Sequence, residues 1–315
     1  MKKKNEVEQF AKKFNKKYGN FTYSGEMALE VALKHIDVKD KKVIIQNNVC
    51  HRVLLSILRS GGIPILVKPK NEFVIDEEDL RRITKKYRDI AAVIIIHQYG
   101  IEADLKSIKK SINGKNIKII EDIAQSWGIH NIGKFSDYVI TSFAKSKPLS
   151  FGIGGGIFTD FADINTILDI NFRTSRATEK EILPYVLPSN IKISYRKMCK
   201  IGDQNIRRQI NNAKAVNHII ISDYKKINCL AICKGVWNRY PVWTNDYTEY
   251  QKIIKTLDLY NIKYELPHKK SLDELPMLQR YKYFREINDN DIKYIVLIKV
   301  RNLKKRSIIK WKLKK

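Results

Sequence analysis

Between residues 20 and 160, short apolar stretches of strand length alternate with amphipathic stretches of helix length. The expected strands are Val43–Ile45, Ile63–Val67, Ile90–Ile96, Ile117–Ile120 and Tyr138–Ser142. The expected helices are a segment that follows Gly25, Arg52–Leu58, and Ile75–Lys86 with Asp76 as its N-cap. This alternation predicts a mainly parallel sheet covered by helices on both faces, which is a three-layer α/β fold.

The pattern changes after Asp160. Residues 161–225 are polar and are expected to be helical, with a kink or loop around Pro184 and Pro188. Further along, the chain contains an expected strand, helix and second strand: Arg239–Trp243, Tyr247–Tyr260 and Lys293–Val300. We therefore predict a large α/β domain over residues 1–228 and a smaller C-terminal α+β domain over residues 229–315.

The formal net charge of +27 arises from 60 basic and 33 acidic residues. One interpretation is an anionic partner such as nucleic acid, a membrane surface or a phosphorylated substrate. The other is compositional bias, which we favour because lysines are scattered along the chain. The segment Arg301–Lys315 is a basic cluster around Trp311, either a surface-binding tail or a solvated terminal helix or strand.

No apolar run reaches the roughly 18–20 residues that a membrane helix needs, and no hydrophobic signal region follows the basic N-terminus. The four cysteines have no paired CxxC spacing; they are Cys50, Cys199, Cys229 and Cys233. We expect neither a metal site nor a disulfide, and a cytoplasmic location.

The residues that indicate chemistry lie between Ile119 and Asp160. Glu121 and Asp122 end an expected strand, Lys147 follows the next strand, and a glycine run, Gly152 with Gly154–Gly156, comes after it. Open α/β sheets bind ligands at the carboxyl ends of their strands, and glycines let the backbone approach a ligand closely. An amine and a carboxylate at this edge suit a cofactor that needs a Schiff-base lysine and an acid against a pyridinium nitrogen.

Here the chain resembles the DegT/DnrJ/EryC1/StrS family of pyridoxal-phosphate-dependent sugar aminotransferases, which has the fold of aspartate aminotransferase (fold type I). The matching motifs are Glu121-Asp122-Ile123-Ala124-Gln125, Ser142-Phe143 followed by Lys147, and the glycine run. Ser24-Gly25-Glu26-Met27-Ala28-Leu29 resembles the family's phosphate turn, and Gly61–Pro64 and His97–Asp104 agree in order and spacing. The resemblance covers residues 20–160 and, more faintly, Arg239–Val242.

The resemblance implies a role for each matched residue. Lys147 would hold pyridoxal 5'-phosphate covalently and move the proton, Asp122 would pair with the ring nitrogen, and Gln125 would lie near the phenolic oxygen. The amides of Gly25, Glu26 and Met27 and the hydroxyl of Ser142 would bind the phosphate. Without the motif we would interpret Lys147 as a surface lysine, and Lys145 competes with it for the role. Asp122 could instead cap the helix that follows its strand.

Three departures from the family pattern stand out. Glu26 replaces a small hydroxyl residue, so its side chain either turns toward solvent or the site holds no phosphate. The position that in the family supplies an aromatic ring to stack on the cofactor falls near Cys50 and His51. The imidazole of His51 could stack there, or His51 could simply precede a helix. The segment 161–225, which in the family lends residues to the partner subunit, matches poorly; Arg173, Asn190 and Arg196 are the candidates.

The implied function is transfer of an amino group from an amino acid, commonly glutamate, to a nucleotide-linked keto sugar within a homodimer. The product would be an amino sugar for a surface polysaccharide or glycoconjugate. Two alternatives remain: a non-catalytic family member that acts as a binding or scaffold protein, and a binder of nucleic acid or another anionic surface.

Overall fold

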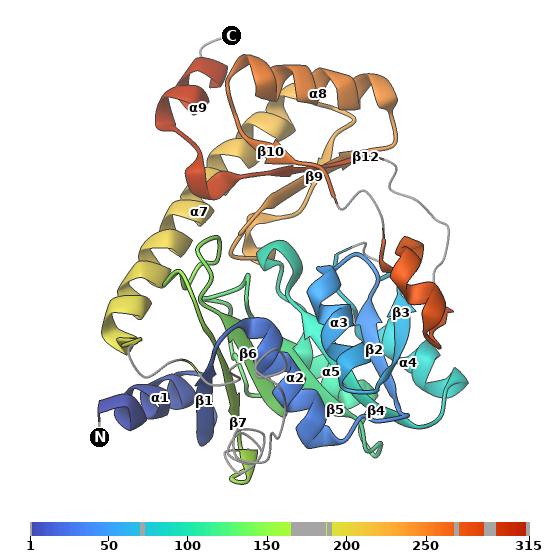
Figure 1. Cartoon of the computed structure of the whole chain (residues 1–315). Helices are drawn as coiled ribbons and strands as arrows, with labels where there is room; N and C mark the ends of the chain where they lie inside the picture. The colour runs from blue at the N-terminus through green and yellow to red at the C-terminus, as the bar shows by residue number, and fades with distance from the viewer. Residues whose placement is uncertain are drawn as a thin grey trace.

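The structure is a computed structural model that describes residues 2–69, 73–164, 187, 191–267, 271–286 and 294–312. Within these residues, an eight-stranded sheet forms one part of the molecule and a four-stranded sheet forms another. The long helix α7 (Tyr195–Asp223) runs from the first part to the second (Figure 1). None of the helices in these ranges combines the length and apolar character that crossing a bilayer requires.

The large sheet confirms the predicted fold class. Its strands, in spatial order, are β1 (Tyr18–Thr22), β7 (Gly155–Thr159), β6 (Tyr138–Ser142), β5 (Lys118–Asp122), β4 (Ile90–Ile96), β2 (Lys42–Gln46), β3 (Ile63–Val67) and β11 (Phe284–Glu286). The run from β6 to β11 is parallel, and β7 is antiparallel to both β6 and β1. Every residue of β4 is buried, as expected for a central strand covered on both faces.

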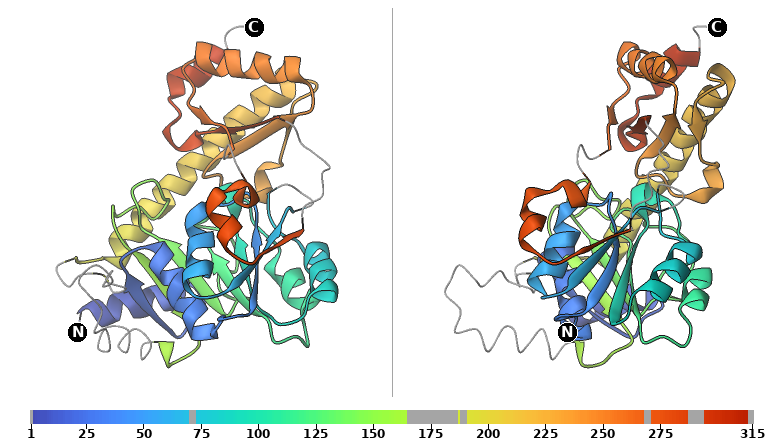
Figure 2. Two further views of the ribbon diagram at one scale, coloured as in Figure 1. Left: turned by 45° about the vertical axis from the view of Figure 1, so that its right-hand side comes forward. Right: turned by 90° about the vertical axis from the view of Figure 1, so that its right-hand side faces the viewer.

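Helices cover both faces of this sheet. Helices α2 (Gly25–Ile36) and α3 (His51–Arg59) lie on one face, and α4 (Glu77–Lys86) and α5 (Leu105–Ser111) lie on the other (Figure 2). The predicted N-cap of α4 is confirmed, because the Asp76 carboxylate accepts hydrogen bonds from two backbone amides of the first turn. Helix α1 (Lys2–Lys13) and strands β1 and β7 were not predicted; an aromatic cluster joins them.

The smaller sheet is antiparallel, in the order β10 (Tyr264–Glu265), β12 (Tyr294–Ile298), β9 (Tyr240–Thr244) and β8 (Asn228–Cys229). Helices α8 (Tyr247–Leu259) and α9 (Lys305–Lys312) belong to the same part of the molecule. The expected strand, helix and late strand of this region are present. The helix expected within residues 161–225 is present as α7, whereas the kink expected around Pro184 and Pro188 falls outside the described residues.

The structure differs from the predicted division of the chain at residues 271–286. This segment, with the short helices η3 (Leu272–Glu274) and η4 (Pro276–Arg280), returns to the large sheet, where β11 pairs with β3. Leu272 and Leu278 are buried in the same core cluster as α2 and α3. The small sheet therefore does not include all of residues 229–315, because apolar side chains inside that range are buried against the large domain.

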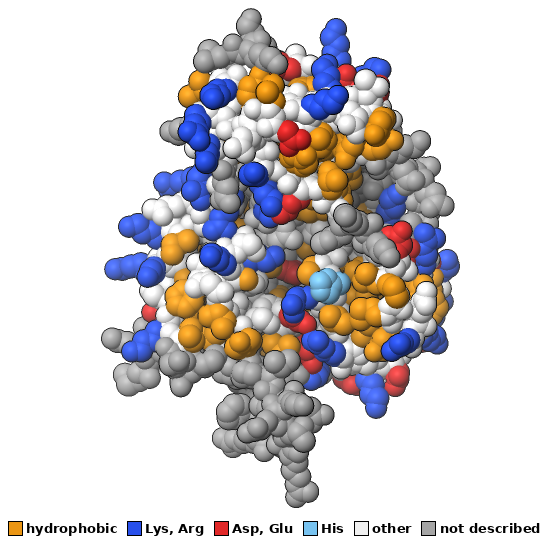
Figure 3. Space-filling model, turned by 45° about the horizontal axis from the view of Figure 1, so that its top comes forward, with side chains coloured by type: hydrophobic (Ala, Val, Ile, Leu, Met, Phe, Trp, Pro, Cys, Tyr) orange, Lys and Arg blue, Asp and Glu red, His pale blue; other side chains and the backbone are white. Residues whose placement is uncertain are grey.

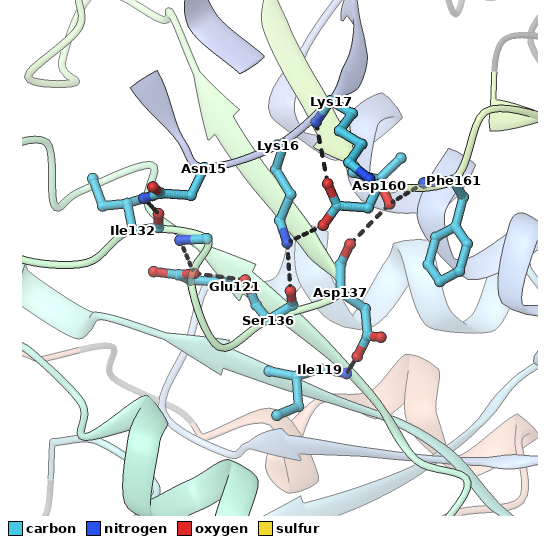
Figure 4. Close-up of polar contacts among 12 residues, drawn as sticks. Asn15, Lys16, Lys17, Ile119, Glu121, Ile132, Ser136, Asp137, Asp160 and Phe161 are labelled. Carbon is cyan, nitrogen blue, oxygen red and sulfur yellow. Dashed lines mark hydrogen bonds and ion pairs between the residues drawn. The ribbon is translucent and has the colours of Figure 1, made fainter. Parts of the chain in front are cut away.

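A buried polar network fixes the end of β5 (Figure 4). Glu121 is fully buried, and its Oε2 accepts hydrogen bonds from Gly133 N at 2.8 Å and Ser136 Oγ at 2.7 Å. The Nζ of Lys16, which precedes β1, donates to Ser136 O at 2.6 Å and pairs with Asp160 at 3.1 Å. Glu121 thus anchors the strand end, although it had been grouped with Asp122 as a ligand-facing acid.

Candidate active site

A cavity of about 500 Å³ lies at the carboxyl ends of the parallel strands. The segments that follow β2, β4, β5 and β6 line it, together with the first turn of α2. Strand β2 lies between β3 and β4, and the chain passes from β2 to β3 and then back across β2 to β4. The cavity therefore lies beside the point where the strand order reverses. A larger hollow of about 880 Å³ at the opposite edge contains none of the predicted site residues.

Lys147 and Asp122 line the same cavity. Asp122 is the last residue of β5, and its Oδ1 accepts a hydrogen bond from Ala124 N at 2.8 Å. Burial raises the pKa of the Asp122 carboxyl above its ordinary value, and the Ala124 amide and the charge of Lys147 offset part of this effect. The two groups are therefore close enough to interact electrostatically within one cavity, although 25 positions separate them in the chain.

The backbone that carries Lys147 is held from two other elements. Arg301, in the short helix η5 (Val300–Asn302), donates from Nη1 to the carbonyl oxygen of Lys147 at 2.8 Å. Asn205 of α7 donates from Nδ2 to the carbonyl oxygen of Pro148 at 2.9 Å. These bonds fix the loop after β6, so that Lys147 is presented from a restrained backbone. Lys145, the competing lysine, is exposed and does not line the cavity.

Gly25, Met27, Gln125 and Ser142 also line the cavity. A Cβ added at Gly25 would lie 3.0 Å from Ser142 Cβ, so glycine allows the start of α2 to lie against the end of β6. The amide of Met27 already donates to the Ser24 side chain at 3.2 Å, so this amide caps the helix. The Oε1 of Gln125 accepts from Asn238 Nδ2 at 3.1 Å, which fixes the amide orientation.

The glycine run contributes to backbone packing rather than to the cavity lining. Gly152 and Gly154–Gly156 are not among the lining residues. A Cβ at Gly155 would lie 2.4 Å from Gly25 N, closer than atoms can approach. The glycine run was expected to approach a ligand closely; in the structure Gly155 instead lies against Ser24 and Gly25, which brings β7 close to the start of α2.

The Glu26 side chain does not turn toward solvent, which was one of the two predicted alternatives. Its side chain is only 8% exposed, and its two carboxylate oxygens accept hydrogen bonds from Arg52 Nη1 and Arg59 Nη1, each at 2.6 Å. The hydrogen bond and the charge of Glu26 raise the pKa of the Arg52 guanidinium. The carboxylate thus lies at the cavity with its charge compensated by two cations on α3.

His51 is the predicted site residue that the structure leaves outside the cavity lining. It is the first residue of α3 and its side chain is exposed, whereas Cys50 and Val53 line the cavity. Of the candidates for a partner's site, Arg173 and Asn190 lie outside the described residues. Arg196 is exposed in the first turn of α7.

The sequence did not predict several residues that line the cavity or hold its wall. Arg52, Arg59 and Gln98 line the cavity, and Asn238 and Arg301 reach its wall from the C-terminal part of the chain. Arg52 and Arg59 lie seven positions apart and therefore on one face of a helix. This spacing is the local pattern that could have indicated a pair of cations at one place. Nothing local relates Asn238 or Arg301 to Gln125 or Lys147.

An amine, an acid and a helix N-terminus around one cavity can bind an anionic carbonyl compound and exchange protons with it. The site lies on a mainly parallel sheet of this strand order between two helical layers. Together they define the class of protein: the chain has the fold of fold type I pyridoxal-phosphate-dependent transferases.

Comparison with known proteins narrows the class to a family. Residues 2–194 match the sequence profile described as DegT/DnrJ/EryC1/StrS aminotransferase family. The chain belongs to this family.

Two curated relatives are each 30% identical to the chain. One is dTDP-3-amino-3,6-dideoxy-alpha-D-galactopyranose transaminase of Aneurinibacillus thermoaerophilus, over 68% of this chain and 63% of that protein. The other is 3-oxo-glucose-6-phosphate:glutamate aminotransferase of Bacillus subtilis, over 49% of this chain and 36% of that protein. The matched regions thus span about a third to two thirds of these relatives.

Two solved structures have the same fold at 17% identity. The first is ntda from Bacillus subtilis with bound cofactor PMP, with a TM-score of 0.77 over 100% of this chain and 76% of that chain. The second is E. coli GDP-4-keto-6-deoxy-D-mannose-3-dehydratase with bound hydrated PLP, with a TM-score of 0.79 over 99% of this chain and 91% of that chain.

Proposed function

We propose that the protein is a pyridoxal-phosphate-dependent aminotransferase that converts a nucleotide-linked keto sugar to an amino sugar, with an amino acid, expected to be glutamate, as the donor. The product would enter a surface polysaccharide or glycoconjugate. The observation that carries the proposal is that Lys147 and Asp122 line one cavity at the carboxyl ends of the sheet, in a chain of this family. The proposed working form is a cytoplasmic homodimer.

The residues present fit the cofactor. Gly25 lets the start of α2 lie against Ser142 at the cavity, where the helix amides and the Ser142 hydroxyl would bind a phosphate group. Asp122 presents a carboxyl group to the cavity, where it would pair with a ring nitrogen. Lys147 has a primary amine in reach of the same space, and Gln125 supplies an amide that Asn238 orients.

Each side chain then has a task in transamination. Pyridoxal phosphate, when bound, supplies an aldehyde carbon and an electron-accepting ring. Lys147 would act as the nucleophilic amine that holds the cofactor, and later as the base and acid that moves a proton between donor and acceptor carbons. Asp122 would keep the ring nitrogen protonated, and Arg301 and Asn205 would keep the lysine backbone in place.

The test is covalent attachment of the cofactor. The purified protein, mixed with pyridoxal 5'-phosphate, is expected to develop absorbance at the edge of the visible range, and borohydride should fix one cofactor on the peptide that contains Lys147. Lys147→Ala should abolish the fixed label, whereas Lys145→Ala, which removes a neighbouring exposed lysine, should retain it. Equal labelling of Lys147→Ala and wild type would refute the proposal.

The two alternatives give different results in the same preparation. A non-catalytic family member would show no fixed label and no amino transfer from glutamate to a nucleotide-linked keto sugar. A nucleic-acid binder would show retention on nucleic acid that falls steeply with salt. On the face shown in Figure 3, basic side chains are spread over both parts of the molecule, which gives no single strip for such a partner.

A further inference from the structure

Glu26 brings a carboxylate to the first turn of α2, the end of the cavity where helix amides would bind an anion. An uncompensated carboxylate there would repel a phosphate group. The structure instead pairs each of its oxygens with a different guanidinium, from Arg52 and Arg59. We name these three side chains the Glu26–arginine cluster, and its formal charge is one positive unit.

The cluster is built into the contact between α2 and α3. Arg52, Ser56 and Arg59 occupy one face of α3, and the buried Ser56 Oγ donates to the backbone oxygen of Glu26 at 3.3 Å. The carboxylate is 8% exposed, whereas the side chains of Arg52 and Arg59 are 64% and 44% exposed. The acid is thus the buried member, and the two cations are the members that a ligand can reach.

Both guanidinium groups keep donors for a ligand. In the part of the chain that the structure describes, the guanidinium groups of Arg52 and Arg59 each donate from Nη1 to Glu26. A guanidinium carries several further N–H donors, whose fork geometry matches phosphate oxygens. Both arginines line the same cavity as Gly25 and Ser142, the residues expected to face a phosphate group.

We propose that Arg52 and Arg59, oriented by Glu26, bind a phosphate group at this end of the cavity and replace the hydroxyl residue of the family's phosphate turn. This inference rests on the proposed function, and it adds the residues that recognise the anion. The phosphate belongs either to pyridoxal phosphate or to the diphosphate of a nucleotide-linked sugar. Glu26 is a positioning residue, because it acts through the two arginines.

The experiment measures discrimination between two aldehydes that differ only in the phosphate group. Pyridoxal 5'-phosphate and pyridoxal are titrated separately into cofactor-free protein. The dissociation constant of pyridoxal divided by that of pyridoxal 5'-phosphate reports the contribution of the phosphate group. Arg52→Gln/Arg59→Gln is expected to reduce this ratio about ten- to hundredfold, the range for loss of hydrogen bonds to a charged group. Because both arginines are partly exposed, the reduction should be smaller at high salt.

The control variant removes the same charge elsewhere. Arg81→Gln/Arg88→Gln eliminates two exposed cations from outside the cavity lining and should leave the ratio unchanged. Since the double cluster variant leaves Glu26 unpaired, Glu26→Gln/Arg52→Gln/Arg59→Gln serves as a neutral version, and its ratio should also fall at least about tenfold. A purely structural role for the cluster would lower the melting temperature of these variants without changing the ratio.

A second measurement separates the two sources of phosphate. Thymidine 5'-diphosphate is titrated into wild type and into Arg52→Gln/Arg59→Gln, each already loaded with pyridoxal phosphate. A reduced aldehyde ratio assigns the arginines to the cofactor's phosphate, whereas an unchanged ratio with at least about tenfold weaker thymidine diphosphate binding assigns them to the substrate. Unchanged values in both titrations overturn the inference. Wild type that binds neither aldehyde would instead refute the proposed function.

Discussion

Two neighbouring acids, Glu121 and Asp122, have opposite tasks because successive side chains of a strand point to opposite faces. Glu121 is fully buried among donors from the turn that contains Gly133 and Ser136. Asp122 faces the cavity and accepts one backbone hydrogen bond, from Ala124. The Glu121 carboxylate stabilises the strand end, whereas the Asp122 carboxyl lies where burial disfavours its charged form.

For the protein without cofactor, we expect Asp122→Asn to increase the free energy of unfolding at neutral pH by about 1 kcal/mol, the usual size of a stabilising change. Burial raises the pKa of Asp122, so the folded state retains its proton to higher pH than the unfolded state. The protonated carboxyl therefore contributes to the free energy of unfolding at low pH. This contribution is lost as the pH rises above about 4, the ordinary aspartate value, and through the pKa of the folded state. Urea unfolding between pH 4 and 8 measures this difference.

Glu121→Gln is the matched comparison. Oε2 of Glu121 accepts from Gly133 N and Ser136 Oγ, and Oε1 lies 3.3 Å from His97 Nε2. Because an amide has only one acceptor oxygen, this variant should lose about 1–3 kcal/mol. Cofactor affinity should fall in Asp122→Asn, because the ring nitrogen would lose its acid partner. If Asp122→Asn and wild type unfold identically at every pH, the carboxyl is not held in an unfavourable environment.

At the scale of elements, α7 connects the lysine loop to the small sheet. Gly202 of α7 lies against Trp127, and a Cβ there would be 2.6 Å from the indole Nε1 and 2.9 Å from Leu149. Asn205, one turn later, bonds the carbonyl oxygen of Pro148. The glycine thus allows the helix to approach the segment that carries Lys147, although glycine lowers helix propensity.

We expect Gly202→Ala to lower the free energy of unfolding by about 1–3 kcal/mol, since overpacking against the buried Trp127 outweighs the propensity gained with alanine. Thermal unfolding would measure the loss, and cofactor titration would report whether the lysine loop has moved. The exposed residue Asn211 of the same helix provides the control, because Asn211→Ala should be neutral or slightly stabilising. A stabilised Gly202→Ala protein would show that α7 does not pack tightly here.

At the scale of the whole molecule, the chain crosses between its two parts more than once. After β10 it returns to the large sheet as β11, and then continues to β12 of the small sheet. Glu286, the last residue of β11, accepts hydrogen bonds from Arg82 Nη1 at 2.6 Å, Lys86 Nζ at 2.6 Å and Tyr87 Oη at 2.5 Å. This carboxylate ties the returning segment to α4.

Glu286→Gln is therefore expected to destabilise the protein by about 1–3 kcal/mol at neutral pH. Burial opposes the charge of Glu286, but its bonds to Lys86, Tyr87 and Arg82 outweigh burial and lower its pKa. A lowered pKa stabilises the folded state above the ordinary glutamate value of about 4.3, and this stabilisation is lost as the pH falls through the folded pKa. The difference in melting temperature between wild type and Glu286→Gln should shrink on acidification; a constant difference down to pH 3 would contradict this account.

The sequence by itself determined the succession of strands and helices and the positions of Lys147, Asp122, Gln125 and Ser142. These features depend on short-range periodicity and on motif spacing, which are local properties of a chain. The predicted strands at β3, β4 and β6 have the same bounds in the structure for this reason, since short runs rich in apolar and β-branched residues mark buried strands directly.

The tertiary structure alone decided which distant groups meet. Arg59 reaches Glu26 across 33 positions, Arg301 reaches the backbone of Lys147 across 154, and residues 271–286 return to the large sheet. No local pattern encodes such pairs, because they follow from how the layers and the two sheets pack. The pairing of Glu26 with Arg52 and Arg59 belongs to this second group.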